Sequence, residues 1–303
     1  MGKTSQSDSK KAKRFMLKIL IELAIIIVGW ALVVSFFAFY TSIRPKKIIG
    51  SVTPESFGYQ YQAVSFKTED GLNLKGWFVP SKTSPAGTII VLHGYPAEKG
   101  DVLTWALFLH DRYNLLFFDF RYFGESEGSY TTIGWKEQKD LQAAVSYLKT
   151  RSDVDPQKIG VMGFSLGGAV AIMGAGNIPE VKAVVADSPY ATLDDLADML
   201  FRRFSILKKP LIWSAKQWSK LFLKFDFSQV SPLAAARNSA TPLLLIHGDQ
   251  DRQIPLEQSK KIFEAAKGPV ELWQVNGADH GGAYFQNKEI YESKVLGFFE
   301  KYL

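Results

Sequence analysis

The stretch IGVMGFSLGGAVAIMGA, residues 159–175, decides the fold. The apolar run at 159–162 predicts a buried strand, and the small and apolar residues at 166–175 predict a helix. Between them stands the pentapeptide Gly-x-Ser-x-Gly, centred on Ser165. A sharp strand-to-helix turn presents such a serine hydroxyl, and the flanking glycines relieve crowding. Leu166 is then the first residue of the helix, and its N–H can stabilise an oxyanion.

Strands and helices alternate on both sides of this stretch. A hairpin is expected from residues 59–68 and 72–79, which alternate apolar and polar residues around Glu69-Asp70-Gly71. Short apolar runs of the kind buried in parallel sheets follow at 88–92, 115–118, 159–162, 183–186, 243–246 and 270–275. Helical stretches lie between them, with further candidates at 102–110, 256–266 and 290–302. This pattern predicts an α/β domain with a mostly parallel sheet and flanking helices.

About fifty residues separate the strand ending at Asp187 from the one beginning near Pro242, which is long for a connection. They are rich in Phe, Trp and Leu interleaved with Lys and Arg. We interpret residues 190–232 as a small helical cap inserted in the sheet domain. A crossover helix with a loop is the alternative. The same composition also raises the hypothesis that the cap docks on a membrane.

The basic character of the chain is local. Its formal charge is +6, yet residues 1–47 carry nine basic and two acidic side chains, whereas the other 256 carry 27 basic and 28 acidic. A nucleic-acid-binding protein needs its basic patch on the folded domain, so no nucleic-acid partner is expected. The chain has no cysteine, which excludes disulfides, thiolate metal sites and a cysteine nucleophile.

The basic excess flanks an apolar segment. Residues 23–40 contain no charge, and the segment extends back to Phe15 if Lys18 and Glu22 lie near the interface. About 20 apolar residues span a bilayer as a helix, so 15–40 is interpreted as a membrane anchor. A cleaved signal peptide and a buried core helix are the alternatives, but the bulky residues 35–40 do not resemble a cleavage site.

Anchor and domain divide the chain into four parts. Residues 1–14 are expected to be a disordered basic tail, 41–57 a linker broken by Pro and Gly, and 58–303 the α/β domain. Six basic residues precede the uncharged segment and three follow it. The positive-inside rule therefore predicts a cytoplasmic N-terminus and a catalytic domain outside.

A serine nucleophile needs a base that removes its proton. Only His280, in the loop after the last predicted strand, follows both Ser165 and a late acid. Asp251 is the preferred acid, because a carboxylate in that loop can fix the imidazole tautomer. Asp249 is the second candidate and Asp187 a distant third.

A second oxyanion donor is expected from the loop after residues 88–92. Tyr95 supplies the N–H there, since Pro96 has none. His93 and His247 are interpreted as structural hydrogen-bonding residues, and His110 as a surface residue.

Five motifs together carry a resemblance to a known family. They are HGYP (93–96), DFRYFGES (119–126), GFSLGG (163–168), HGDQDRQIP (247–255) and GADHGG (277–282). Over roughly residues 58–303 the chain resembles the α/β-hydrolase superfamily, within it the dienelactone-hydrolase and prolyl-oligopeptidase-like serine hydrolases, including membrane-anchored bacterial members. The resemblance implies an α/β-hydrolase fold, the triad Ser165, Asp251 and His280, and no metal or organic cofactor. The family usually has Gly soon after the Arg of the second motif, where Tyr122 stands here.

These observations predict a membrane-anchored serine hydrolase that cleaves a carboxylic ester, thioester or amide through an acyl-enzyme. Its expected partners are a small-molecule acyl substrate and, through the N-terminal helix, membrane lipid. A peptidase and a non-catalytic binding protein on the same fold are the alternatives. The oligomeric state is left open.

Overall fold

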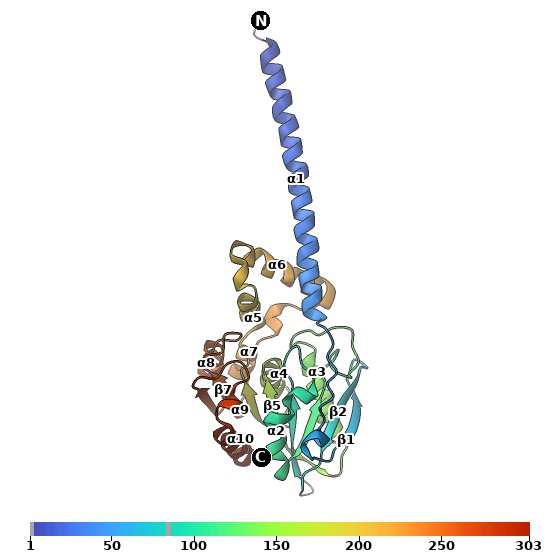
Figure 1. The fold of residues 1–303 in the computed structure, drawn as a ribbon, viewed down its shortest axis with the longest axis vertical. Helices are drawn as coiled ribbons and strands as arrows, with labels where there is room; N and C mark the ends of the chain where they lie inside the picture. Colours follow the sequence, from blue (N-terminus) through green and yellow to red (C-terminus); the bar gives the residue numbers. More distant parts are fainter. Residues whose placement is uncertain (1–2, 83–85) are drawn as a thin grey trace.

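A mostly parallel β-sheet forms the centre of the protein, as the alternating pattern predicts (Figure 1). The computed structural model describes residues 3–82 and 86–303. The described residues form an eight-stranded sheet in the order β1-β2-β4-β3-β5-β6-β7-β8, in which β2 is antiparallel to both of its neighbours and the other pairs are parallel. The strands are β1 (Gln62–Lys67), β2 (Asn73–Val79), β3 (Ala86–Leu92), β4 (Asn114–Phe118), β5 (Val154–Phe164), β6 (Val181–Asp187), β7 (Leu243–Gly248) and β8 (Val270–Val275).

The predicted hairpin is confirmed. Phe66 of β1 pairs with Leu74 of β2, and the N–H of Thr68 donates to the carbonyl of Leu72 to close the turn. Gly71 lies in this turn with φ +88°, a conformation that glycine adopts without strain. The pair β1 and β2 therefore forms one edge of the sheet, away from the strands that carry the serine motif.

Helices cover both faces of the sheet. One apolar core contains buried side chains of α3 (Glu137–Leu148), α4 (Leu166–Ala175), α7 (Pro232–Asn238) and α8 (Glu257–Ala265). The other contains those of α2 (Leu103–Ala106) and α10 (Lys288–Tyr302). Short elements complete the domain: η1 (Pro54–Phe57), η2 (Lys99–Val102), η3 (Leu107–Asp111) and α9 (Ala283–Gln286).

One predicted helix is divided. The pattern at 102–110 predicts a single helix, but α2 ends at Ala106 and a 3-10 helix continues as η3. The division occurs because the backbone of Ala106, at φ −131° and ψ −18°, leaves helical values. His110, at the end of this segment, is not the surface residue expected: its side chain is 15% exposed and packs edge-on against Tyr59.

The N-terminal helix α1 (Lys3–Ile43) is long and extends away from the domain (Figure 1). The expectation of a disordered tail is wrong for residues 3–14, which are helical, and residues 1–2 lie outside the described part. No Gly or Pro interrupts residues 3–14, so the helix continues into them. Its C-terminal end lies past residue 40, at Ile43, shortly before Pro45 disfavours helical backbone. From Ala12 to Ile43 it is long and apolar enough to cross a membrane.

The insertion between β6 and β7 is helical. Residues 190–232, hereafter the cap, contain α5 (Leu193–Leu200), the 3-10 helix η4 (Arg202–Leu207), α6 (Lys208–Trp218), the π-helical turn η5 (Ser219–Leu223) and η6 (Phe227–Gln229). Some of its apolar side chains are buried, such as those of Leu223 and Phe225, whereas others, such as Ile206 and Trp213, are exposed. The cap lies beside the domain end of α1, which contacts α6 (Figure 1).

Candidate active site

The serine motif forms a strained turn between β5 and α4. Ser165 has φ +51° and ψ −112°, values that a side-chain-bearing residue rarely adopts. The chain turns sharply because its neighbours are glycines: a Cβ on Gly163 would lie 2.3 Å from the backbone of Gly167, and one on Gly167 would lie 2.3 Å from the carbonyl oxygen of Leu92. The N–H of Ser165 donates to the carbonyl of Asp187 at 2.8 Å and fixes the turn.

Ser165, His280 and Asp251 lie together at the carboxyl edge of the sheet. They follow β5, β8 and β7, whose ends meet there because these strands are parallel. The Ser165 Oγ lies 3.1 Å from Nε2 of His280, and Nδ1 of His280 lies 2.6 Å from Oδ2 of Asp251. The carboxylate accepts the Nδ1 proton, which leaves Nε2 to accept the serine hydroxyl.

Asp251 is held as a carboxylate. Burial favours its neutral form, but hydrogen bonds from the imidazoles of His247 and His280 and from the N–H of Ile254 outweigh burial and keep the pKa of Asp251 well below its usual value. Its Oδ1 accepts the N–H groups of Gln253 and Ile254, and its Oδ2 lies 2.6 Å from Nδ1 of His280 and 3.4 Å from Nε2 of His247. The negative charge of Asp251 is thus held beside Nδ1 of His280, on the side of the imidazole away from Ser165.

The other two candidates for the acid, Asp249 and Asp187, form hydrogen bonds with groups other than His280. Asp249 accepts the N–H of Gly277 at 2.8 Å and so holds a turn. Asp187 is buried and accepts hydroxyl hydrogen bonds from Ser188 and Tyr291; burial raises its pKa. The carboxylate that accepts the Nδ1–H of His280 is therefore the first-choice residue, Asp251.

His93 and His247 are structural, as predicted. His93 is fully buried, donates from Nδ1 to the carbonyl of Gly94 and accepts the N–H of Phe120 at Nε2. Burial lowers the pKa of His93 and keeps the ring neutral. His247 accepts the hydroxyl of Ser259 at Nδ1, and its Nε2–H is shared between the carbonyl of Ile254 at 2.7 Å and Oδ2 of Asp251 at 3.4 Å.

The predicted oxyanion donors flank the serine. Leu166 is the first residue of α4, which places its N–H at the helix N-terminus beside Ser165. On the other side, a Cβ built on Gly94 would lie 3.4 Å from the Cβ of Ser165, and Tyr95 is the next residue. The loop that carries Tyr95 therefore passes directly beside the serine.

Two aromatic residues near the histidine escaped the sequence analysis. Phe164, the residue before Ser165, packs against His280 with ring centroids 4.9 Å apart, and Trp105 packs against Phe164 at 4.7 Å. They limit the positions open to the imidazole. Phe164 occupies a variable position of the pentapeptide, so the motif held no signal for this contact.

Tyr122 occupies the position where the resemblance expects glycine. Its φ is +75°, a value that costs energy for a tyrosine. Its hydroxyl donates to the carbonyl of Pro45 at 2.6 Å, which ties the segment after α1 to the domain. The same loop is anchored by Arg121, whose guanidinium pairs with Asp140 and Asp70. The departure from glycine thus serves a contact with the N-terminal segment.

The last turns of α1 contact the domain, a relation that the sequence did not predict. Phe39 and Ile43 are each 7% exposed and belong to the larger apolar core. The N–H of Thr131 donates to the carbonyl of Ile43, and Nε1 of Trp218 in the cap donates to Oγ of Ser35 at 3.1 Å. An apolar segment near an N-terminus carries no signal that distinguishes lipid-facing from protein-facing turns.

Ser165 lies on a sharp turn at the edge of a mostly parallel sheet and is linked by hydrogen bonds to a histidine and an aspartate. This arrangement defines a serine hydrolase of the α/β-hydrolase fold. Comparison with protein families then shows to which family of serine hydrolases the chain belongs. The model of the prolyl oligopeptidase family matches residues 126–303, and the chain belongs to this family.

Individual relatives cover most of the domain. The esterase Pf2001 of Pyrococcus furiosus superposes with a TM-score of 0.72 at 33% identity, over 86% of this chain and 98% of its own. The uncharacterized protein YfhR of Escherichia coli O157:H7 is 31% identical over 245 residues, 78% of this chain and 80% of its own. The uncharacterized protein YqkD of Bacillus subtilis is 32% identical over 234 residues, 76% of each chain.

Proposed function

We propose that this serine hydrolase cleaves a carboxylic ester through an acyl-enzyme, with Ser165 as nucleophile, His280 as base and Asp251 as acid. The observation that carries the proposal is the continuous pair of hydrogen bonds, 3.1 Å from Ser165 to His280 and 2.6 Å from His280 to Asp251. Pf2001, with a third of its residues identical, is described as an esterase.

The reaction follows from these contacts. Nε2 of His280 takes the hydroxyl proton as the Ser165 oxygen bonds to the substrate carbonyl carbon, and Asp251 stabilises the imidazolium. The oxyanion accepts hydrogen bonds from the N–H groups of Leu166 and Tyr95; losing such a donor costs about 3–4 kcal/mol of barrier. His280 returns the proton to the leaving alcohol. Water, activated by the same imidazole, then hydrolyses the acyl-enzyme.

We also propose that α1 is an uncleaved membrane anchor with its N-terminus in the cytoplasm. Cleavage after the apolar segment, which ends at residue 40, would remove Phe39 from the core, which argues against a signal peptide. The buried helix residues begin at Ser35, so residues 15–34 are left to face lipid, about the length that spans a bilayer. The six basic residues before the uncharged segment set the orientation.

A fluorophosphonate probe and p-nitrophenyl butyrate test the activity, applied to the full chain in detergent micelles. We expect labelling and turnover in the wild type, and a loss of turnover of roughly 10⁴-fold or more in Ser165→Ala. Ser228→Ala, at an exposed serine of the cap, is the matched control and should behave as wild type. A folded wild-type protein that neither labels nor turns over would contradict the proposal and favour a binding protein.

A peptidase is the second candidate, and the family to which the chain belongs favours it. Ester and amide substrates with the same acyl group distinguish the two, for example p-nitrophenyl butyrate and butyryl p-nitroanilide. We expect the ester to be cleaved with the higher kcat/KM. Preferential cleavage of amides, extended to short peptides, would identify a peptidase.

A further inference from the structure

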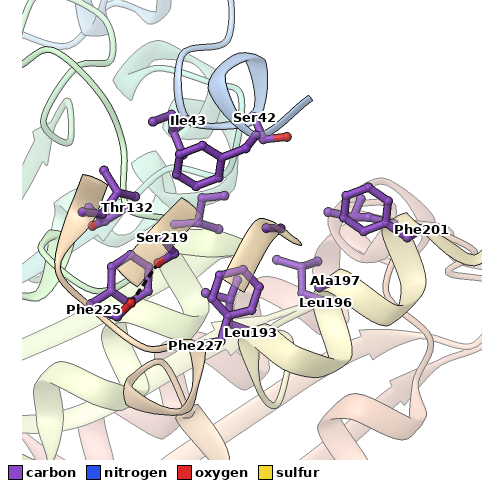
Figure 2. A pocket seen from close by; sticks show the side chains of 15 residues that line it. Ser42, Ile43, Thr132, Leu193, Leu196, Ala197, Phe201, Ser219, Phe225 and Phe227 are labelled. Atoms are coloured by element: carbon purple, nitrogen blue, oxygen red, sulfur yellow. Dashed lines mark hydrogen bonds between the residues drawn. The ribbon is translucent and has the colours of Figure 1, made fainter. Parts of the chain in front are cut away.

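An apolar chamber lies between the end of α1 and the cap, and Figure 2 shows the side chains that line it, none of which is a catalytic residue. Its cavity volume is about 60 Å³, and it is lined by Phe39 and Ile43 of α1, by the α5 residues Leu193, Leu196 and Ala197, and by further cap residues. A single water needs about 10–15 Å³ on the same measure, so the chamber is several times larger than a one-water cavity.

The wall of the chamber offers almost no polar group to a ligand. Three hydroxyl residues line it, and each already donates within the protein: Ser42 to the carbonyl of Ala38, Thr132 to Glu137, and Ser219 to the carbonyl of Phe225. The last of these bonds is drawn in Figure 2. A ligand with polar groups would lose its hydrogen bonds to water there without replacement. The chemistry of the wall therefore selects a hydrocarbon.

The chamber lies close to the level at which α1 leaves the protein. From Ala12 onward, Ser35 is the first buried residue of the helix, and Phe39 and Ile43 follow it by four and eight residues. At 1.5 Å per residue, these are about 6 and 12 Å along the helix axis. Leu200 lines the chamber although it is 61% exposed, so the chamber opens to the surface at this residue. The apolar surface thus continues from the bilayer-facing helix into the chamber.

One residue connects the chamber to the catalytic serine. The hydroxyl of Tyr95 donates to the carbonyl of Ser42, which is a chamber-lining residue, at 2.8 Å. The backbone of Tyr95 follows Gly94, whose position lies against Ser165. Tyr95 therefore joins the loop beside the serine to a residue of the chamber wall.

We propose that the chamber binds the hydrocarbon chain of a membrane-derived acyl ester, which enters from the bilayer between α1 and the cap while its carbonyl reacts at Ser165. This inference rests on the proposed function and adds its substrate class. The helix α1 is then a wall of the substrate site as well as an anchor.

The test uses the full chain in phospholipid nanodiscs and compares p-nitrophenyl acetate with p-nitrophenyl dodecanoate. Ala215→Phe fills the chamber, and Leu200→Ser places a hydroxyl at its exposed mouth, where the fold tolerates the change. We expect both to lower the dodecanoate-to-acetate ratio of kcat/KM by about tenfold. Ala234→Phe, on the exposed side of α7, is the matched control and should leave the ratio unchanged.

Binding is measured separately from catalysis in Ser165→Ala, with a fluorescent undecanoate as probe. Saturable binding that Ala215→Phe removes supports the chamber. If neither chamber substitution changes binding of the probe or the preference for chain length, the chamber proposal is overturned. This holds even when the enzyme is labelled normally and cleaves p-nitrophenyl acetate. Absence of labelling and of acetate cleavage contradicts the proposed function instead, so the two failures are distinguishable.

The route is tested by placing the dodecanoate ester either in the nanodisc that holds the enzyme or in separate nanodiscs. Entry from the bilayer predicts at least a several-fold faster initial rate in the shared disc. Equal rates would overturn lateral entry and indicate uptake of the ester from water.

Discussion

The phenolic oxygen of Tyr95 lies 2.8 Å from the carbonyl oxygen of Ser42, so a hydrogen bond joins the loop beside the catalytic serine to the last turn of α1. Burial raises the pKa of Tyr95 to about 12, which keeps the hydroxyl protonated as a donor throughout the physiological range. The position of a proposed oxyanion donor thus depends on a residue of the N-terminal helix.

Tyr95→Phe should therefore reduce catalysis without removing the backbone donor itself. We expect kcat to fall by roughly 3- to 30-fold as the loop loses its tie, with a stability loss of about 0.5–1.5 kcal/mol. Steady-state kinetics and thermal unfolding of the full chain in detergent measure the two effects. Tyr122→Phe, which removes the bond to Pro45, is the matched control: it should cost similar stability with a smaller change in kcat.

Asp251→Asn should remove most of the activity while leaving the fold intact. An asparagine keeps an oxygen for the Gln253 and Ile254 N–H groups but loses the charge behind His280. We expect kcat to fall by about 10⁴-fold. Asp249→Asn retains the oxygen that accepts the Gly277 N–H and should remain close to wild type. The reverse ranking of these two variants would assign the acid role to Asp249.

The strained backbone of Ser165 predicts an inverted stability order for two inactive variants. Glycine normally destabilises relative to alanine, but at φ +51° the alanine retains the strain of a Cβ and the glycine does not. Ser165→Gly should therefore be more stable than Ser165→Ala by about 1 kcal/mol. Denaturant unfolding of both variants measures the difference, and an alanine variant that is equally or more stable would show that the turn is unstrained.

Glu98 predicts a dependence of stability on pH. It is 4% exposed, and burial raises its pKa to about 7, while the nearby Lys99 pairs at shorter distances with Asp119 and Glu125. Between the unfolded pKa of about 4.5 and the folded value, the unfolded chain has lost the proton that the folded chain keeps. This group's contribution to stability is therefore complete below that window and declines as pH rises through it.

Glu98→Gln removes this titration and retains a carbonyl acceptor. Relative to wild type, the variant should gain roughly 1–3 kcal/mol on going from pH 4.5 to pH 8, since each unit of pKa shift corresponds to about 1.4 kcal/mol. Unfolding curves at several pH values measure the difference. A difference between variant and wild type that stays constant with pH would show that Glu98 is ionised in the folded protein.

Features encoded locally were predictable from the sequence. The order of strands and helices, the turn at Ser165 and the loop positions of Asp251 and His280 follow from apolar periodicity and from glycines that only a tight turn requires. The hydrogen bonds between these residues agree with the proposed roles but do not test the chemistry. The two oxyanion donors also stay predictions, because their role depends on where a substrate oxygen lies.

Features that arise from contacts between distant segments were not predictable. The packing of Phe39 and Ile43 against the cap depends on shape, and an apolar helix residue has the same appearance in lipid and in a protein core. Helix formation at 3–14 was missed because polar composition argued for disorder, whereas the adjoining long helix nucleates the segment. Tyr122 did mark an unusual position, but its partner Pro45 lies 77 residues away.

The burial of Phe39 and Ile43 has a practical consequence for the preparation of this protein. A fragment that starts at residue 48, the obvious choice for a soluble enzyme, lacks both side chains and the Ser42 and Pro45 carbonyls that Tyr95 and Tyr122 use. Such a fragment lacks part of the apolar core and two hydrogen bonds that hold the loops around the catalytic serine. Crystallisation trials and substrate screens that begin from it would measure the consequences of truncation, so the whole polypeptide in a lipid environment is the appropriate starting material.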